Sequence, residues 1–105
     1  MARRRDIIGV LDATGNSFAY GVVSVTAVAT AIPTTVLNNR KAITVFNADP
    51  TNWVYLGDAS VTSANGYPLL PYQGLPFDMG SGGALYGICE AGKTANVRYL
   101  QLDNA

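Results

Sequence analysis

Apolar and polar residues alternate along short stretches of this chain, and residues that favour turns separate these stretches at close intervals. The first clear stretch, VVSVTAVATAI, runs from Val22 to Ile32 and is followed by Pro33. Successive side chains of a strand point to opposite faces, so this alternation predicts one strand. Pro33 should end it, because proline has no N–H to donate to a neighbouring strand. The predicted core face of this strand consists of Val23, Val25, Ala27, Ala29 and Ala31.

Five later stretches are rich in β-branched and aromatic residues, which also favour strands. They are Lys41–Asn47, Trp53–Asp58, Leu75–Met79, Ala84–Cys89 and Asn96–Leu102. The short connections between them lead us to expect that the first two form one hairpin and the last two another. Pro76 indicates an edge strand or a bulge, and residues 60–74 are expected to be mostly loop because they contain Pro68 and Pro71.

A helical period is absent from this pattern, and short strands separated by turns are typical of an all-β fold. We therefore predict a single β-sandwich, jelly-roll-like in topology, with about six to eight strands across residues 20–105. Residues 1–19 are predicted to form an extended N-terminal arm, because Gly9, Gly15 and Asn16 interrupt any regular element there.

Composition adds an expectation about the surface. The chain has 105 residues, of which 49% are hydrophobic and 13% are charged. A chain this apolar should fold rather than remain disordered. A domain of this size still leaves roughly a third of its unfolded-state surface uncovered, so the scarcity of charge predicts docking or homo-oligomerisation.

The charge is unevenly distributed. Seven basic and seven acidic residues cancel, but Arg3, Arg4 and Arg5 carry three of the positive charges, which leaves four basic residues from Asp6 onward. A basic face of the kind that binds nucleic acid is therefore not expected. The arginine triplet is either a solvated terminus or an arm that docks on an acidic neighbour or a polyanion. No membrane partner is expected, because no apolar run approaches the roughly 18 residues of a membrane span.

Catalytic chemistry is poorly represented. The chain has no histidine and one cysteine, Cys89. It thus lacks the commonest general base and the commonest metal ligand, and we expect neither an enzyme nor a cofactor or metal site. Cys89 lies in the apolar stretch ALYGICE and is expected to be a buried, inert thiol. The N-terminus does not fit a secretory signal, so synthesis in a reducing cytoplasm is expected.

One string does fit a nucleotide-binding motif: GICEAGKT, Gly87–Thr94, has the P-loop pattern G-x-x-x-x-G-K-[ST]. A P-loop needs a helix after the final Ser or Thr, because the helix N-terminus helps to bind the phosphates. The residues after Thr94 are predicted to form a strand, so the match is interpreted as accidental. Gly87 is then expected at a bulge or close approach, Gly92 at positive φ and Lys93 in solvent.

The aromatic residues are the remaining candidates for function. Trp53 and Tyr55 should share one face of their strand, and Tyr67 and Tyr72 lie in the proline-rich loop. Side chains of this kind cap a core, form a protein interface or stack against sugars, and the pattern leaves all three roles open. The candidate partner contacts are Arg3, Arg4, Arg5, Trp53, Tyr67 and Tyr72.

From about Ala42 to Leu100 the chain resembles a kind of small β-domain found among structural proteins of tailed bacteriophages. The resembling pieces are AITVFNADPTNWVYLGDASVTSANGYPLLPYQGLPFDMG and ALYGICEAGKTANVRYL. The resemblance implies a compact, often oligomeric sandwich or jelly-roll-like module that assembles into the virion as a head decoration (cement) or fibre component. It carries over no site residue.

These observations together predict a non-enzymatic virion protein, assembled in the host cytoplasm. The first expectation is a capsid decoration protein, trimeric, that bridges subunits of the major capsid protein or contacts another virion protein. The alternative is a receptor- or glycan-binding module of a tail or head fibre.

Overall fold

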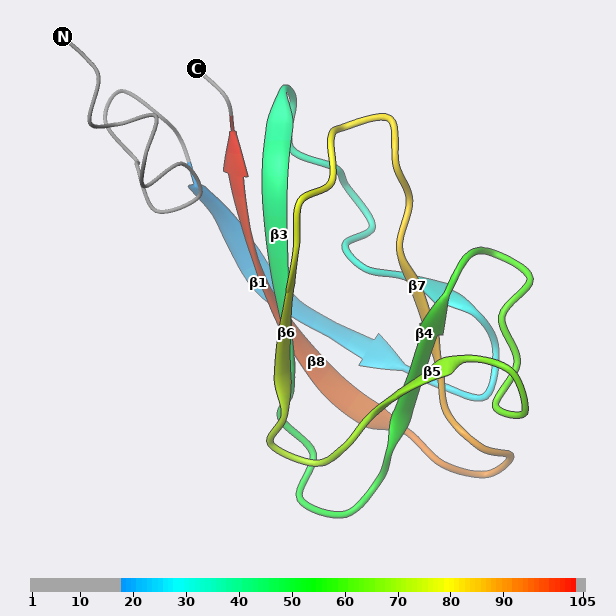
Figure 1. Ribbon diagram of the computed structural model, residues 1–105. Coiled ribbons are helices and arrows are strands. Elements are labelled where there is room, and N and C mark those ends of the chain that lie inside the picture. The colour runs from blue at the N-terminus through cyan, green and yellow to red at the C-terminus, as the bar shows by residue number, and fades with distance from the viewer. Residues whose placement is uncertain (1–17, 104–105) are drawn as a thin grey trace, which may run out of the picture.

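The computed structural model describes residues 18–103, so Arg3, Arg4, Arg5 and residues 1–17 of the expected arm lie outside the described part. The described chain is all-β, without a helix, and forms two antiparallel sheets of four strands each (Figure 1). The strands are β1 (Phe18–Val25), β2 (Thr30–Ala31), β3 (Arg40–Asn47), β4 (Val54–Gly57), β5 (Tyr67–Leu69), β6 (Gly74–Phe77), β7 (Tyr86–Ile88) and β8 (Ala95–Asp103).

The strand order is β1-β8-β3-β6 in one sheet, called the long sheet here, and β2-β7-β4-β5 in the other, the short sheet. The chain pairs as if folded in half between β4 and β5. The first strand pairs with the last, β2 with β7, β3 with β6 and β4 with β5. Figure 1 shows the two sheets as separate layers, with β1, β8, β3 and β6 on one side and β4, β5 and β7 on the other.

The hydrophobic core lies between the two sheets. Val25, Val45 and Val97 contribute to it from the long sheet, and Val54 and Leu69 from the short sheet, all with an exposed fraction of 0%. Full burial of a side chain of this size stabilises the fold by about 1.5–3 kcal/mol, so this row of β-branched and leucine residues holds the sheets together.

The predicted strand from Val22 to Ile32 is wrong in its extent. β1 ends at Val25 and pairs in the long sheet, whereas β2 begins at Thr30 and pairs in the short sheet. Between them Thr26 Oγ1 accepts the N–H of Val28, and the Thr30 hydroxyl donates to the Val28 carbonyl. Such local bonds replace strand pairing and turn the chain. Val23 and Val25 are buried as predicted, but Ala27 is exposed.

Both predicted hairpins are also wrong, although their strands exist. β3 and β4 belong to different sheets, and so do β7 and β8, so each short connection crosses between the layers. Alternation predicts the two faces of a strand but not which neighbour the strand pairs with. Pro76 does lie in an edge strand, as predicted. Pro68 also lies in a strand, β5, which the sequence did not predict; β5 is an edge and tolerates proline.

A buried arginine anchors the connection that follows β6. The register of β3 against β8 shifts between Arg40 and Ala42, so that Lys41 is an extra residue in β3. This bulge turns Arg40 toward the side of the sheet on which Gln101 lies. The Arg40 guanidinium donates to Gln101 Oε1 at 3.0 Å and to the backbone carbonyls of Met79, Gly80 and Gly83 at 2.9–3.1 Å. Because its polar atoms are bonded, this charge is tolerated at an exposed fraction of 3%.

Candidate functional site

The connection from β3 to β4 is built around a buried asparagine. Asn47 has an exposed fraction of 0%, and its Nδ2 donates to the carbonyls of Asn52 at 2.9 Å and Leu69 at 3.0 Å. Its Oδ1 accepts the backbone N–H of Asp49 at 3.0 Å. One side chain therefore closes the loop and ties it to β5.

The carboxylate of Asp49 organises the second half of this loop. Oδ2 accepts the backbone N–H groups of Thr51 and Asn52. These bonds favour the charged form and lower the pKa of Asp49 from its usual value, with the Asn52 bond the largest cause. The loop is thus held in a fixed shape by backbone and side-chain bonds just before Trp53.

A second loop lies against the first. Asn52 Nδ2 donates to the carbonyl of Thr94 at 2.8 Å, which joins the β3–β4 connection to the β7–β8 connection. That second connection turns tightly, because Lys93 donates its N–H to the Glu90 carbonyl at 3.0 Å and Gly92 adopts a φ of 77°. The positive φ of Gly92 confirms the prediction made from the sequence.

The two loops and β4 line a surface pocket of about 370 Å³. We call it the Trp53 pocket; its lining residues are Thr51, Asn52, Trp53, Tyr55, Glu90 and Lys93. The Trp53 and Tyr55 rings lie 6.4 Å apart between centroids and are tilted by 35°, and Trp53 is 44% exposed. The Tyr55 hydroxyl donates to Glu90 Oε2 at a long 3.5 Å, and desolvation, followed by the Glu90 charge, raises the pKa of Tyr55.

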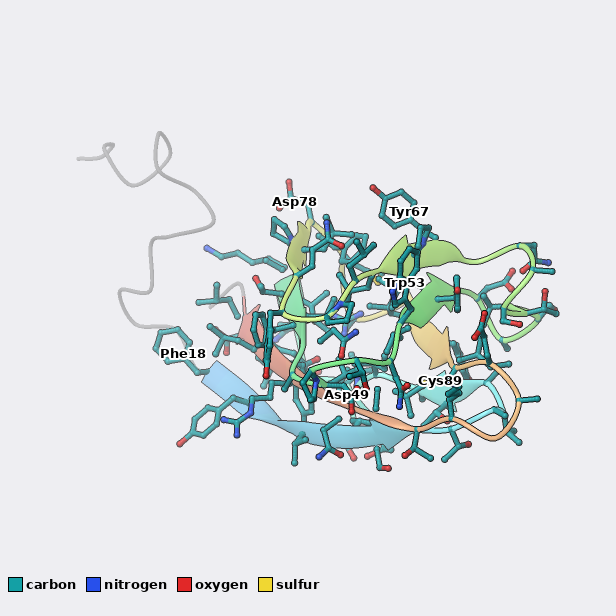
Figure 2. All side chains as sticks on the ribbon, turned by 90° about the horizontal axis from the view of Figure 1, so that it is seen from below. Phe18, Asp49, Trp53, Tyr67, Asp78 and Cys89 are labelled. Carbon is teal, nitrogen blue, oxygen red and sulfur yellow. The ribbon has the colours of Figure 1, made fainter. Side chains whose placement is uncertain are left out.

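The predicted aromatic contacts do not gather in one place. Trp53 lies in the Trp53 pocket, whereas Tyr67 lines a separate apolar pocket with Leu75 and Leu85, and Tyr72 stacks on Phe46 at 6.4 Å. Figure 2 shows Trp53 and Asp49 on the same connection, with Phe18 at a distant point of the fold. The shared face of Trp53 and Tyr55 could be read from strand alternation. The proximity of Glu90 and Lys93 to Trp53 could not be read from the sequence, because these two residues belong to another loop.

The outer face of the long sheet, the one turned away from the core, carries a group of exposed apolar side chains. Tyr20 of β1 lies beside Leu100 of β8. Val22 of β1 lies beside Arg98 of β8, which in turn lies beside Phe46 of β3. Tyr20 is 77% exposed and Val22 59%. We call this surface the outer face; its exposed apolar members are Phe18, Tyr20, Val22, Phe46 and Leu100, with Tyr72 stacked alongside Phe46.

The outer face was not predicted, because Phe18 and Ala19 were assigned to the arm and the first strand was expected to begin at Val22. β1 in fact begins at Phe18. The signal was present, since Phe18, Tyr20 and Val22 alternate with smaller residues. Within the strands, alternation places one charged residue on this face, Arg98. Exposed apolar side chains grouped in this way make the outer face a candidate interaction surface.

The nucleotide-binding motif has no helix to complete it. Its first glycine lies in β7 and Thr94 is followed directly by β8, which confirms the predicted strand. Gly87 lies at the predicted close approach: an added Cβ would meet Ile32 Cδ1 at 2.8 Å. This stretch is a strand end and a turn rather than a phosphate cradle.

The one thiol is buried, as predicted. Cys89 has an exposed fraction of 2%, and desolvation by burial, followed by the charges of Asp49 and Glu90, raises its pKa to about 11. A thiol with this pKa is protonated at neutral pH and is a poor nucleophile. Within residues 18–103 there is also no cluster of three or more metal-ligating side chains and no helix long and apolar enough to cross a membrane.

Comparisons with protein-family models, with curated protein sequences and with solved structures found no match.

Proposed function

We propose that this protein is a non-enzymatic component of a bacteriophage virion, a decoration protein that docks on the capsid and strengthens it. The observation that carries this proposal is the outer face, which combines long strands, exposed aromatic and aliphatic side chains and little charge. The resemblance of residues 42–100 to structural domains of tailed phages supports the choice of partner.

The mechanism is mechanical. Burying Tyr20, Val22 and Phe18 against shell subunits contributes free energy in proportion to the apolar area removed from water. A copy that contacts two subunits of the major capsid protein at their junction raises the free energy needed to separate them. We take the homo-oligomer to be a trimer, since three copies around one junction would place three such faces on the shell.

The strand order supports assigning the fold as a jelly roll. β1 to β4 pair in turn with β8, β7, β6 and β5, as in one long antiparallel ribbon wound into two sheets. Jelly rolls occur in viral capsid proteins and in lectins, so the fold is compatible with a capsid role without specifying it. The expected N-terminal arm precedes β1, whose first residue, Phe18, belongs to the outer face, and on this proposal the arm adds to the attachment.

The test is co-sedimentation of the full chain with capsids purified without it. Tyr20→Asp introduces a charge in the middle of the outer face, and we expect it to weaken binding by about a hundredfold or more, because an unpaired charge would be buried. Tyr67→Asp is the matched control: Tyr67 is also exposed, at 60%, but lies on another surface.

Wild-type protein that stays in the supernatant with every capsid tested would contradict the decoration function. Binding that survives Tyr20→Asp but is lost in Tyr67→Asp would contradict the assignment of the outer face. A variant lacking residues 1–17 measures the contribution of the arm, and the mass of the free protein in solution tests the trimer.

A further inference from the structure

We propose that the Trp53 pocket is a carbohydrate-binding site that holds one uncharged pyranose unit of a surface glycan. This inference does not depend on the decoration function, because it rests on a different surface. It adds Asn52, Glu90 and Lys93, which the sequence did not connect to this site, to the predicted pair of Trp53 and Tyr55.

The aromatic pair supplies the stacking surface. Sugars present a face of C–H groups that packs against the electron-rich face of an aromatic ring, and tryptophan offers the largest such ring. Trp53 keeps 44% of its surface exposed although Val54, its neighbour in the chain, has 0%. Tyr55, at 35° to Trp53, forms a second wall. A flat hydrophobic contact with an angled wall suits a ring-shaped ligand better than an extended chain.

The polar residues supply the hydrogen bonds that a sugar needs. The Glu90 carboxylate accepts bonds from neighbouring hydroxyl groups, and the Lys93 ammonium donates to hydroxyl or ring oxygens. The Tyr55 hydroxyl reaches Glu90 at 3.5 Å, a weak bond that sugar hydroxyls can replace. Glu90 and Lys93 offset each other's charge, which favours a neutral sugar over a phosphate or an acidic sugar.

The pocket is shaped before the ligand arrives. Asn47 and Asp49 fix the loop that carries Thr51 and Asn52, and the Asn52 bond to Thr94 fixes the distance between the two loops. Preorganisation of this kind reduces the entropy lost on binding. The volume of about 370 Å³ lies at the lower end of the range for small-molecule sites, roughly 300–1,000 Å³, as expected for one sugar ring.

The Trp53 pocket and the outer face lie on opposite sides of the two-sheet fold. Val54 and Leu56 point into the core, so Tyr55 points away from the long sheet. A copy docked through its outer face would therefore leave the Trp53 pocket open to solvent, and one function need not block the other.

The chain offers its own reporter for a test, because Trp53 is the one tryptophan. A printed array of bacterial and animal oligosaccharides, probed with the full-length protein, first identifies ligands. Titration of the soluble form of the best of them, followed by tryptophan emission, should give a saturable change. Glu90→Gln should weaken this binding by about tenfold or more, equivalent to at least 1.4 kcal/mol, through loss of charge-assisted hydrogen bonds.

Trp53→Ala removes the reporter, so its binding is measured on the array, where we expect loss of signal. Tyr72→Ala is the matched control, since it removes an exposed aromatic residue outside the pocket and should leave sugar binding unchanged. Absence of saturable binding to any neutral glycan would overturn the proposal. Binding that survives both Trp53→Ala and Glu90→Gln would also overturn the proposal. If Trp53→Ala fails to fold, Glu90→Gln decides the question, because Glu90 lies at an exposed position.

The two proposals fail separately. Glu90→Gln should co-sediment with capsids as the wild type does, and Tyr20→Asp should retain sugar binding. A protein that binds glycans but no capsid would support the site and contradict the decoration function.

Discussion

At the scale of single residues, the position of Arg40 depends on one extra residue in β3. The register shift next to Lys41 directs the guanidinium toward Gln101 and the carbonyls of the β6–β7 connection. Burial lowers the pKa of Arg40, but the guanidinium remains charged, because arginine is not deprotonated in proteins. The Arg40 guanidinium therefore holds the β6–β7 connection in place through its hydrogen bonds to the backbone carbonyls.

Arg40→Met keeps much of the side-chain volume but removes the donors. We expect it to lower the free energy of unfolding by about 2–4 kcal/mol, because buried carbonyl groups lose their partners. Arg98→Met, at an exposed position of β8, is the control and should change it by less than about 0.5 kcal/mol. Urea denaturation followed by Trp53 emission measures both. Equal midpoints for the two variants would show that the Arg40 bonds add nothing to stability.

At the scale of elements, the two connections around the Trp53 pocket behave as one unit. Each is short and crosses between the sheets, and the Asn52–Thr94 bond joins them. The charge of Asp49 organises the first connection through backbone N–H groups. The shape of the pocket should therefore depend on pH in the range where Asp49 titrates.

The pKa of Asp49 is lowered in the folded protein, so its contribution to stability is present above the unfolded pKa, about 3.9, and is lost as the pH falls through the lower folded value. Asp49→Asn should be less stable than the wild type near neutral pH, and the difference should shrink as the pH falls below about 4. Urea midpoints at a series of pH values measure this. A difference that stays constant or widens toward acid pH would contradict the role of the Asp49 charge.

At the scale of the whole molecule, the core between the two sheets leaves no room for a side chain at Gly87 of β7. A Cβ at this position would lie 2.8 Å from Ile32 Cδ1, 3.1 Å from Val54 Cγ1 and 3.6 Å from Val25 Cγ1. Val25 belongs to the long sheet and the other two belong to the short sheet or adjoin it. The absence of a side chain at Gly87 thus leaves the space that Ile32 and Val54 occupy in the core.

Gly87→Ala should lower the free energy of unfolding by about 1–3 kcal/mol, because the methyl group overpacks the core. Gly82→Ala is the matched control: nothing lies within 4 Å of its Cβ position, and it should be neutral or slightly stabilising. Thermal unfolding of the two variants gives the comparison. A Gly87→Ala protein as stable as the control would mean that Ile32 and Val54 move aside at little cost.

The sequence by itself determined the all-β class, the position of most strands and the alternation of their two faces. Alternation placed Val54 and Leu56 on one face of their strand and Trp53 and Tyr55 on the other, because this property depends on a residue's immediate neighbours. The structure decided that Val54 and Leu56 are the pair in the core. The same local reasoning identified the turn at Gly92 and rejected the nucleotide-binding motif.

Only the tertiary structure decided which strands pair and which loops meet. β3 lies beside β8 and β6 rather than β4, and the break between β1 and β2 depends on bonds made by Thr26 and Thr30. Strand pairing is a long-range property, set by how two sheets share one core, and alternation carries no information about the partner. For the same reason Glu90 and Lys93 join Trp53 at the candidate site, while Tyr67 and Tyr72, which are nearer to one another in the sequence, lie on separate surfaces.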